Sequence, residues 1–168
     1  MLLPLLAALT LKTVDGRSET LFPAEDRKAT VLIVVLAECP VAQKYSPALQ
    51  KIAKDYAPKG VRFLMAFADG EPAAIRTQMR AYALPFPAAR TNPRLLGMLK
   101  ATAAPTAALI GADGGVAYVG RIDDRFPALG VQRTPRRADL RIALDQFLAG
   151  KPVTPSRTPV VGCFLPNG

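Results

Sequence analysis

The chain of 168 residues contains no histidine and no tryptophan, and it has only two cysteines. Imidazole is the commonest general base and metal ligand near neutral pH. Its absence therefore excludes Ser-His-Asp hydrolysis, Cys-His proteolysis and the usual zinc sites. The chain also lacks an apolar run of roughly 18 residues, so we expect no membrane span. The reactive side chains that remain are Cys39 and Cys163, which lie too far apart to form a C-x-x-C metal pair.

Acidic residues are scarce relative to basic ones, with 13 Asp and Glu against 22 Lys and Arg and a net charge of +9. Such an excess can indicate a nucleic-acid or other anionic partner. Here the basic residues are scattered along the whole chain, and the densest group has no aromatic residues between its members. This group is Arg133, Arg136, Arg137 and Arg141. We interpret it as the solvated face of a helix, and we expect no nucleic-acid partner.

The first residues, MLLPLLAALTL, are apolar and include the small residues Ala7 and Ala8, but no basic region precedes them. Residues 1–8 are therefore either the remnant of a secretory signal or part of an ordinary first strand. A signal would make the protein exported, to the periplasm or outside the cell, whereas a strand would fit a cytoplasmic protein. Export would suit a bond between the two cysteines, since oxidising compartments preserve disulfides.

Hydrophobic periodicity predicts an α/β domain over residues 9–150. The expected strands are 9–14, paired as a hairpin through Asp15-Gly16, then 30–37, 61–68, 105–111 and 115–121. The expected helices begin near Val41, Pro72, Asn92 and Pro135. Crossover units followed by a closing hairpin predict one mixed sheet with helices on both faces. The functional site is then expected at the carboxyl ends of the parallel strands, where Cys39 lies.

Two segments fall outside these elements. Residues 122–135 are irregular and long enough for a functional loop, and we interpret the charges of Asp123, Asp124 and Arg125 as solvating it, with substrate contact as the alternative. Residues 151–168 form a proline-rich tail that carries Cys163. From Gly150 to Cys163 the tail can extend about 43 Å at roughly 3.3 Å per residue. The radius of gyration expected for the domain is only about 15 Å, so Cys163 can reach Cys39.

Cys39 ends an apolar run and precedes Pro40, which suits the first helical position because proline has no N–H to leave unpaired. Unpaired N–H groups and the helix dipole favour a thiolate at the start of a helix, and they lower the thiol pKa. We therefore expect an exposed, activated sulfur at residue 39. Pro47 is expected to kink the helix without ending it. The alternative is a buried, inert thiol.

The stretch AECPVAQKYSPALQKIAKDY resembles the active-site strand and helix of thioredoxins, where C-x-x-C is followed by a kinking proline. Cys39 stands at the first cysteine of that motif, Ala42 at the second and Pro47 at the proline. The later stretch TAAPTAALIGADGGVAYVGR resembles the segment in which a cis proline, followed by threonine, faces the cysteines; this matches Pro105 and Thr106. The resemblance covers about residues 25–150 and implies a thioredoxin-like three-layer fold.

The chain departs from thioredoxins in ways that matter for its chemistry. Ala42 replaces the second cysteine, which excludes local two-thiol exchange, and the strand at 30–35 lacks the buried acid of thioredoxins. Peroxiredoxins also follow their reactive cysteine with proline, but they place a threonine where Leu36 stands. They carry an arginine on the later hairpin, where this chain has Tyr118 with Arg121 beyond it.

These features together are most similar to the peroxiredoxin-like or redoxin (AhpC/TSA-type) group of the thioredoxin-like superfamily. Members of this group commonly carry GRIDDR-type sequences and a terminal GC, which here are Gly120–Arg125 and Gly162-Cys163. Together with the position of Cys39 at the start of a helix, the resemblance leads us to expect a thiol-based redox protein. We expect no cofactor and no metal. Met65, Met79 and Met98 with the cysteines would offer soft copper ligands, but two of these methionines are expected in the core.

The leading hypothesis is a thiol-disulfide oxidoreductase that acts on a disulfide or thiol of a protein or small molecule. Cys39 is the nucleophile, Pro105 shapes the substrate groove and Cys163 resolves the intermediate. The other expected groove residues are Glu38, Pro40, Ala104, Thr106 and Arg121. One alternative is a one-cysteine peroxidase in which Cys39 passes through sulfenic acid. Another is a thioredoxin-like binding module for copper or a partner protein, without enzymatic activity and held by a structural Cys39–Cys163 disulfide.

Overall fold

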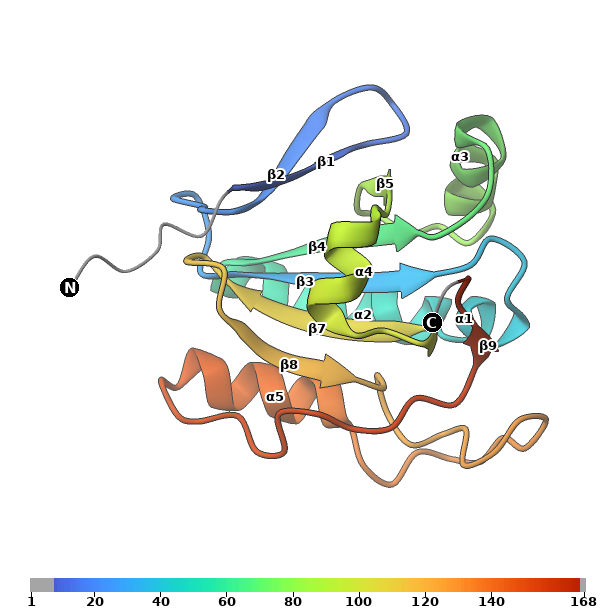
Figure 1. Cartoon of the computed structure of the whole chain (residues 1–168). Coiled ribbons are helices and arrows are strands. Elements are labelled where there is room, and N and C mark those ends of the chain that lie inside the picture. Colours follow the sequence, from blue (N-terminus) through green and yellow to red (C-terminus); the bar gives the residue numbers. More distant parts are fainter. Residues whose placement is uncertain (1–7, 167–168) are drawn as a thin grey trace.

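A five-stranded mixed sheet forms the centre of the protein in the computed structural model, which describes residues 8–166 (Figure 1). The strand order is β5-β4-β3-β7-β8. The strands are β3 (Ala29–Val35), β4 (Val61–Phe67), β5 (Ala88–Arg90), β7 (Thr106–Gly111) and β8 (Val116–Gly120). β3 pairs parallel with β4 and antiparallel with β7, which confirms the predicted mixed sheet. All seven residues of β3 are buried, because the strand is central and covered on both faces.

An antiparallel hairpin precedes this sheet. It consists of β1 (Leu9–Lys12) and β2 (Ser18–Phe22), and it confirms the predicted N-terminal hairpin. Gly16 in the connecting turn has a φ of +86°, a conformation that glycine adopts without a steric penalty. The expectation that residues 1–8 are a signal remnant falls, except for residue 8, outside the described residues.

Helices lie on both faces of the sheet, as predicted. They are α1 (Pro40–Lys44), α2 (Ser46–Tyr56), the 3-10 turn η1 (Ala57–Lys59), α3 (Pro72–Ala81), α4 (Pro93–Leu99) and α5 (Asp139–Leu148). In Figure 1, α2 lies behind the sheet and α4 in front of it. The side chain of Asn92 caps α4 by accepting a hydrogen bond from Leu95 N at 2.8 Å. The hydroxyl of Tyr56 donates to Asp145 Oδ1 at 2.7 Å and joins α2 to α5.

The helix after Cys39 differs from the prediction. It ends at Lys44, and a second helix begins at Ser46, so the chain is interrupted at Tyr45 rather than only kinked near Pro47. Proline at 47 has no N–H for the carbonyl of Gln43, and its ring excludes that carbonyl from the helical position. The interruption therefore falls in the turn before the proline.

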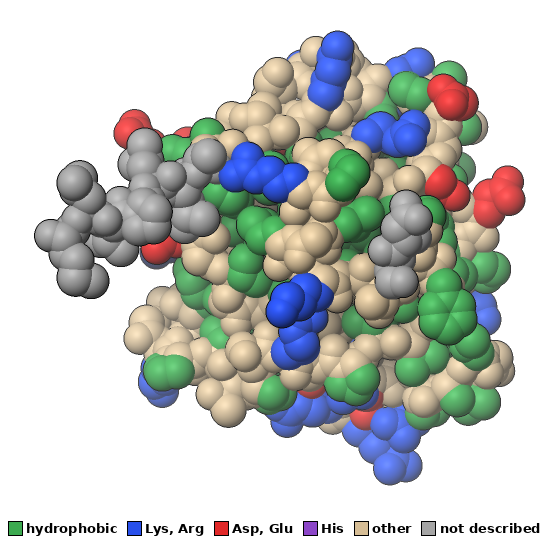
Figure 2. Space-filling view, viewed as in Figure 1, with side chains coloured by type: hydrophobic (Ala, Val, Ile, Leu, Met, Phe, Trp, Pro, Cys, Tyr) green, Lys and Arg blue, Asp and Glu red, His purple; other side chains and the backbone are tan. Residues whose placement is uncertain are grey.

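The last helix begins at Asp139, later than the predicted start near Pro135. The backbone N–H groups of Arg136 and Arg137 both donate to Asp124 Oδ1, at 2.7 and 2.9 Å, which holds these residues in the preceding loop. The interpretation of the dense basic group as a helix face is therefore wrong, since only Arg141 lies on α5. On the side of the molecule shown in Figure 2, Lys and Arg side chains are spread over the surface rather than gathered in one patch.

The proline-rich tail packs back onto the domain. It first runs beside β8, where Val119 N donates to Ser156 O at 3.0 Å and Thr158 N donates to Val119 O at 3.1 Å. It then forms β9 (Cys163–Phe164), which pairs antiparallel with β6 (Ala103–Ala104). Figure 1 shows β9 beside α1, near the end of β3. The tail thus brings Cys163 to the part of the sheet where Cys39 lies.

Candidate redox site

Cys39 and Cys163 form a disulfide, with their Cα atoms 6.0 Å apart. Cys39 is the N-cap residue of α1 and has an extended backbone, and Pro40 occupies the first turn, as predicted. Cys163 comes from β9, so the bond joins the end of the central strand to the tail. Neither cysteine is free in this structure.

The prediction that the Cys39 sulfur is exposed is wrong for the disulfide-bonded protein. Cys39 is only 2 % exposed and belongs to the hydrophobic core cluster. Its Sγ lies 3.6 Å from the carbonyl oxygen of Ala104, beneath the tail. Cys163 remains partly exposed, and its neighbour Phe164 is 82 % exposed. The cover over Cys39 comes from residues far away in the sequence, which is why the local pattern did not reveal it.

Pro105 lies between β6 and β7, and its peptide bond with Ala104 is cis. Ala104 is the residue that pairs with Cys163. The Thr106 hydroxyl donates to Ala103 O at 2.6 Å and fixes the turn around the proline. The structure thus brings three of the predicted site residues, Ala104, Pro105 and Thr106, to the disulfide. All three are buried in this state.

The other predicted groove residues lie in two places. Glu38 and Pro40 flank Cys39 in the sequence and are exposed at the surface. The Arg121 guanidinium pairs with Asp139 Oδ2 at 2.7 Å, and its backbone N–H donates to Thr158 Oγ1 at 3.0 Å. These contacts connect the end of β8 to α5 and to the tail, which is a structural role.

Asp123 connects the loop after β8 to the segment that follows Cys39. Its carboxylate accepts a hydrogen bond from the Tyr45 hydroxyl at 3.0 Å and pairs with Arg125 Nη2 at 2.7 Å. Arg125 also lies over the Tyr45 ring, 4.5 Å from its centroid. Phe126 packs edge-on against the same ring at 5.5 Å. Burial raises the pKa of Tyr45, so the phenol stays neutral and acts as a donor.

Asp124 organises the loop itself. The backbone N–H groups of Arg137 and Arg136 lower its pKa to about 2, and the pairing with Arg133 acts in the same direction. Asp123 and Asp124 are 7 % and 5 % exposed. The interpretation of these acids as solvating charges is therefore wrong, because they are buried acceptors that shape the loop.

Sequence reasoning missed the point where the tail is anchored. Thr158 is buried, and its Oγ1 lies 2.6 Å from the Tyr118 hydroxyl. Gly120 permits this contact, since a Cβ there would stand 2.0 Å from Thr158 Oγ1. The signal in the sequence was Gly120 at the end of a strand. A glycine is needed there because the tail packs against it, which the sequence alone does not show.

Residues 8–166 hold no group of three or more His, Cys, Asp or Glu side chains placed to bind a metal. Met65 and Met79, two of the candidate copper ligands, are buried in the core cluster. Within the same residues, no helix has the length and hydrophobicity to cross a membrane.

Solved structures support the fold. An uncharacterized conserved protein from Geobacillus kaustophilus is 26 % identical with a TM-score of 0.79, covering 94 % of this chain and 87 % of its own. A hypothetical protein from Sinorhizobium meliloti 1021 is also 26 % identical, with a TM-score of 0.80 and coverage of 96 % and 93 %. A thiol:disulfide interchange protein of the thioredoxin family from Chlorobium tepidum is 20 % identical, with a TM-score of 0.62 and coverage of 84 % and 93 %.

Sequence comparison gives the family. No curated protein matches this chain significantly. The model of the AhpC/TSA family matches residues 6–119, which include β3, Cys39, Pro105 and most of β8. That match spans more than half of the chain, and the thioredoxin-like fold agrees with it. The chain therefore belongs to the AhpC/TSA family.

Proposed function

We propose that the protein is a thiol-disulfide oxidoreductase in which Cys39 is the nucleophile and Cys163 the resolving thiol. One observation carries the proposal: the tail bonds Cys163 to Cys39 next to Ala104 and Pro105. The tail thereby supplies the second thiol that is absent at Ala42. Membership of the AhpC/TSA family supports redox chemistry at Cys39.

The reaction begins with the reduced protein. The Cys39 thiolate attacks one sulfur of a substrate disulfide, a new bond joins Cys39 to that sulfur, and the other substrate sulfur leaves as a thiolate. The Cys163 thiolate then attacks Cys39 Sγ. The Cys39–Cys163 bond forms and the substrate leaves as a second thiolate. The substrate disulfide is thus reduced by two electrons, and the two cysteines are oxidised to the disulfide.

Regeneration requires a thiol donor, and the burial of the two sulfurs indicates where that donor attacks. An attacking thiolate approaches the attacked sulfur along the S–S axis while the other sulfur leaves. Cys39 is buried and Ala104 O lies 3.6 Å from its sulfur, whereas Cys163 is partly exposed. A donor thiolate therefore bonds to Cys163 and releases the Cys39 thiolate. A second donor thiol then frees Cys163.

The edge of β6 forms the substrate groove once the tail has moved. In the oxidised protein β9 occupies that edge, with Ala104 opposite Cys163 and Ala103 opposite Phe164. Release of β9 exposes Cys39 next to Pro105. Glu38 and Pro40 then line the groove from the side of α1. The substrate is a disulfide or thiol of a protein or small molecule.

We also propose that the protein is exported, which would suit the Cys39–Cys163 bond because oxidising compartments preserve disulfides. Residues 1–8 would be the remnant of a secretory signal, 9–150 the thioredoxin-like domain and 151–168 the tail. A secreted disulfide oxidoreductase from Mycobacterium tuberculosis shares the fold at 20 % identity, with a TM-score of 0.53 and coverage of 64 % of this chain. We propose a periplasmic or secreted location on these grounds.

A structural disulfide is the second candidate, and the burial of Cys39 favours it. In that case the bond would hold the tail permanently, and the protein would act as a binding module. Structural disulfides have reduction potentials below about −300 mV, whereas catalytic bonds have higher potentials. Equilibration of the wild-type protein with glutathione and dithiothreitol redox buffers separates these two candidates.

Single-cysteine variants test the proposed roles with a fluorescent mixed disulfide as substrate. Cys39→Ser should abolish turnover. Cys163→Ser should perform one exchange and then stop, with the substrate thiol bonded to Cys39 in the mass spectrum. Retention of the wild-type rate by Cys39→Ser would refute the proposal. A one-cysteine peroxidase would instead consume peroxide at the wild-type rate in the Cys163→Ser protein.

The point of donor attack is tested on the oxidised wild-type protein. Brief exposure to glutathione, acid quenching and peptide mapping should place the glutathione adduct on Cys163. The Cys39 thiol released in that step should be the one labelled by N-ethylmaleimide. An adduct on Cys39 would reverse the assigned order without affecting the nucleophilic role of Cys39 in the forward reaction.

A further inference from the structure

A cavity of about 730 Å³ lies at the opposite end of the sheet from the disulfide. It is lined by the start of β4, at Val61 and Phe63, whereas Cys39 follows the end of the parallel strand β3. The seven residues of β3 separate these ends by roughly 20 Å at about 3.3 Å per residue. The cavity is therefore independent of the redox site, and ligand binding in it does not depend on the function proposed for the disulfide.

The cavity exists because β5 covers only part of its neighbour. β5 pairs with β4 from Met65 to Phe67, so the first half of β4 has no strand from residues 8–166 on that side. α2 and the segment after α3 border the opening, through residues such as Ala53 and Phe86. A volume of this size lies in the range typical of small-molecule sites, about 300–1,000 Å³.

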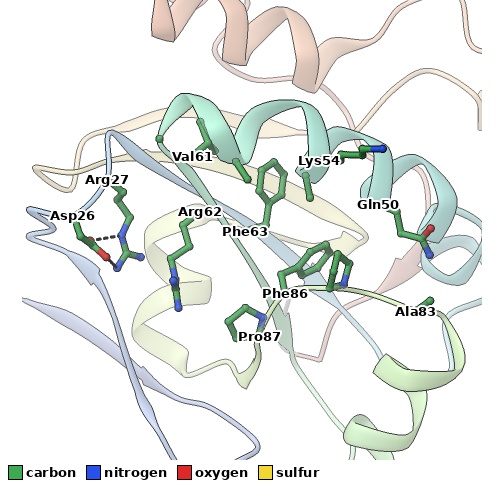
Figure 3. Close-up of a pocket in the computed structure, with 14 residues that line it drawn as sticks. Asp26, Arg27, Gln50, Lys54, Val61, Arg62, Phe63, Ala83, Phe86 and Pro87 are labelled. Atoms are coloured by element: carbon green, nitrogen blue, oxygen red, sulfur yellow. Dashed lines mark hydrogen bonds and ion pairs between the residues drawn. The ribbon is translucent and has the colours of Figure 1, made fainter.

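The interior of the cavity is apolar. The rings of Phe63 and Phe86 have centroids 6.0 Å apart and are tilted by 40°. Figure 3 shows both rings between α2 and Pro87, with Gln50 at one end and Arg27 and Arg62 at the other. Arg62 and Phe63 are neighbours on β4 and leave it on opposite sides, so Arg62 is reached from the rings past the uncovered edge of the strand. The cavity thus has an aromatic middle and a basic end, an arrangement that suits an amphipathic ligand.

The two arginines of the basic end are paired with carboxylates of the protein. Arg27 and Arg62 share the carboxylate of Glu19, with Arg27 Nη1 2.9 Å from Oε1 and Arg62 Nη2 2.8 Å from Oε2. Arg27 also pairs with Asp26 at 2.8 Å. Lys54 also lines the cavity, but Figure 3 shows it on α2 toward Gln50, away from the two arginines. At the basic end, two cations therefore face two carboxylates.

Arg62 is the group that can take an external anion. Its side chain is 41 % exposed, compared with 11 % for Arg27. It meets Glu19 through Nε and Nη2. Among residues 8–166, no hydrogen bond uses Arg62 Nη1. The N–H groups of Nη1 can donate charge-assisted hydrogen bonds to a carboxylate.

We propose that this cavity binds a small amphipathic carboxylate, whose apolar body contacts Phe63 and Phe86 and whose carboxylate pairs with Arg62. The flat rings favour an aromatic body, since tilted and edge-to-face ring contacts add to the burial of apolar area. Neutral molecules of the same shape lose the charge-assisted hydrogen bonds and bind less well.

Isothermal titration calorimetry on the oxidised full-length protein tests the proposal, with 2-naphthoate as the probe and neutral 2-naphthamide as its counterpart. We expect saturable binding of one naphthoate per chain and at least about tenfold weaker binding of the amide, the loss typical of a hydrogen bond to a charged group. Arg62→Gln should weaken naphthoate binding by at least about tenfold. Arg17→Gln, an exposed arginine on the hairpin, should bind as wild type does.

Phe86→Ala provides a second variant that leaves every charge in place. It should weaken both naphthoate and naphthamide, whereas Arg62→Gln should weaken naphthoate alone. Circular dichroism confirms that each variant is folded before titration. Absence of saturable binding to the wild-type protein, or equal naphthoate affinity of wild type and Arg62→Gln, would overturn the proposal.

Discussion

Gly162 lies so close to Ala104 that a Cβ at position 162 would stand 1.7 Å from the Ala104 carbonyl oxygen. This approach is what allows β9 to pair with β6 and what places Cys163 opposite Ala104. The glycine of the terminal GC pair is therefore a packing requirement of the disulfide. The same carbonyl oxygen lies 3.6 Å from Cys39 Sγ.

Gly162→Ala should lower the stability of the oxidised protein, because the added methyl group cannot fit against Ala104 without moving β9. Overpacking of this kind costs about 1–3 kcal/mol in the free energy of unfolding. Guanidinium unfolding of the oxidised and reduced variant measures the loss, which should be confined to the oxidised form. Gly97→Ala on α4 is the matched control, since a Cβ there has no neighbour within 4 Å. An equal loss in both redox states would contradict this explanation.

Cys163→Ser should lower the free energy of unfolding substantially, because the bond closes a loop of 124 residues. The chain-entropy model gives about 5 kcal/mol for a loop of that length. Urea unfolding of the variant and of the oxidised wild type measures the difference. Reduced wild type should have the same free energy of unfolding as the variant. A difference below about 1 kcal/mol between oxidised wild type and the variant would show that the disulfide contributes little to stability.

Asp124→Asn should reduce the loss of folding stability that occurs at acid pH. The pKa of Asp124 in the folded protein, about 2, is below the ordinary value of 3.8, so its charged form stabilises the fold above pH 4. That contribution is lost as the pH falls from about 4 towards 2. Thermal unfolding followed by circular dichroism from pH 2 to 7 should therefore show a flatter acid limb in the variant.

The exposed acid Glu25 provides the control for this experiment. Glu25→Gln should keep the acid limb of the wild-type protein. An unchanged acid limb in Asp124→Asn would mean that the hydrogen bonds from Arg136 and Arg137 do not depend on the charge of the carboxylate.

Tyr118→Phe should loosen the tail without altering either cysteine. The Tyr118 hydroxyl donates to Arg121 O at 2.7 Å and lies 2.6 Å from Thr158 Oγ1. Loss of such a buried hydrogen bond costs about 1–2 kcal/mol. The Thr158 anchor also limits the segment to Cys163 to at most roughly 17 Å. Disulfide re-formation after reduction, followed by thiol alkylation, should therefore become slower.

Tyr56→Phe is the matched control, because its hydroxyl bonds to Asp145 between α2 and α5 and does not touch the tail. It should lose a similar amount of stability but re-form the disulfide at the wild-type rate. Equal rates in the two variants would show that the Thr158 anchor does not position Cys163.

Local sequence patterns were sufficient to predict most of the strands and helices. The continuous apolar runs predicted β3 and β4, because central strands are buried on both faces. Asn92 predicted the start of α4 because its side chain caps the helix within one turn. The short strands β5, β6 and β9 were missed. Each has only two or three residues, too few to show a period.

Only those features of the candidate site that depend on adjacent residues were predictable from the sequence. Cys39 before Pro40, and Pro105 before Thr106, are features of adjacent residues, and the resemblance to thioredoxins brought them together. The burial of Cys39 and the structural use of Asp124 were not predictable, because both depend on residues from other parts of the chain. The sequence does not distinguish an aspartate whose buried carboxylate accepts hydrogen bonds from an aspartate exposed to solvent.

The sequence by itself determined which chemistry is open to this protein. It contains no imidazole, it has two thiols, and one of them stands between a buried strand and a helix. Only the tertiary structure decided that the tail returns to that thiol, covers it and leaves Cys163 at the surface. The physical reason is that local periodicity specifies strands and helices. The path of the tail depends on close contacts at Gly120 and Gly162, which form only when the domain has folded.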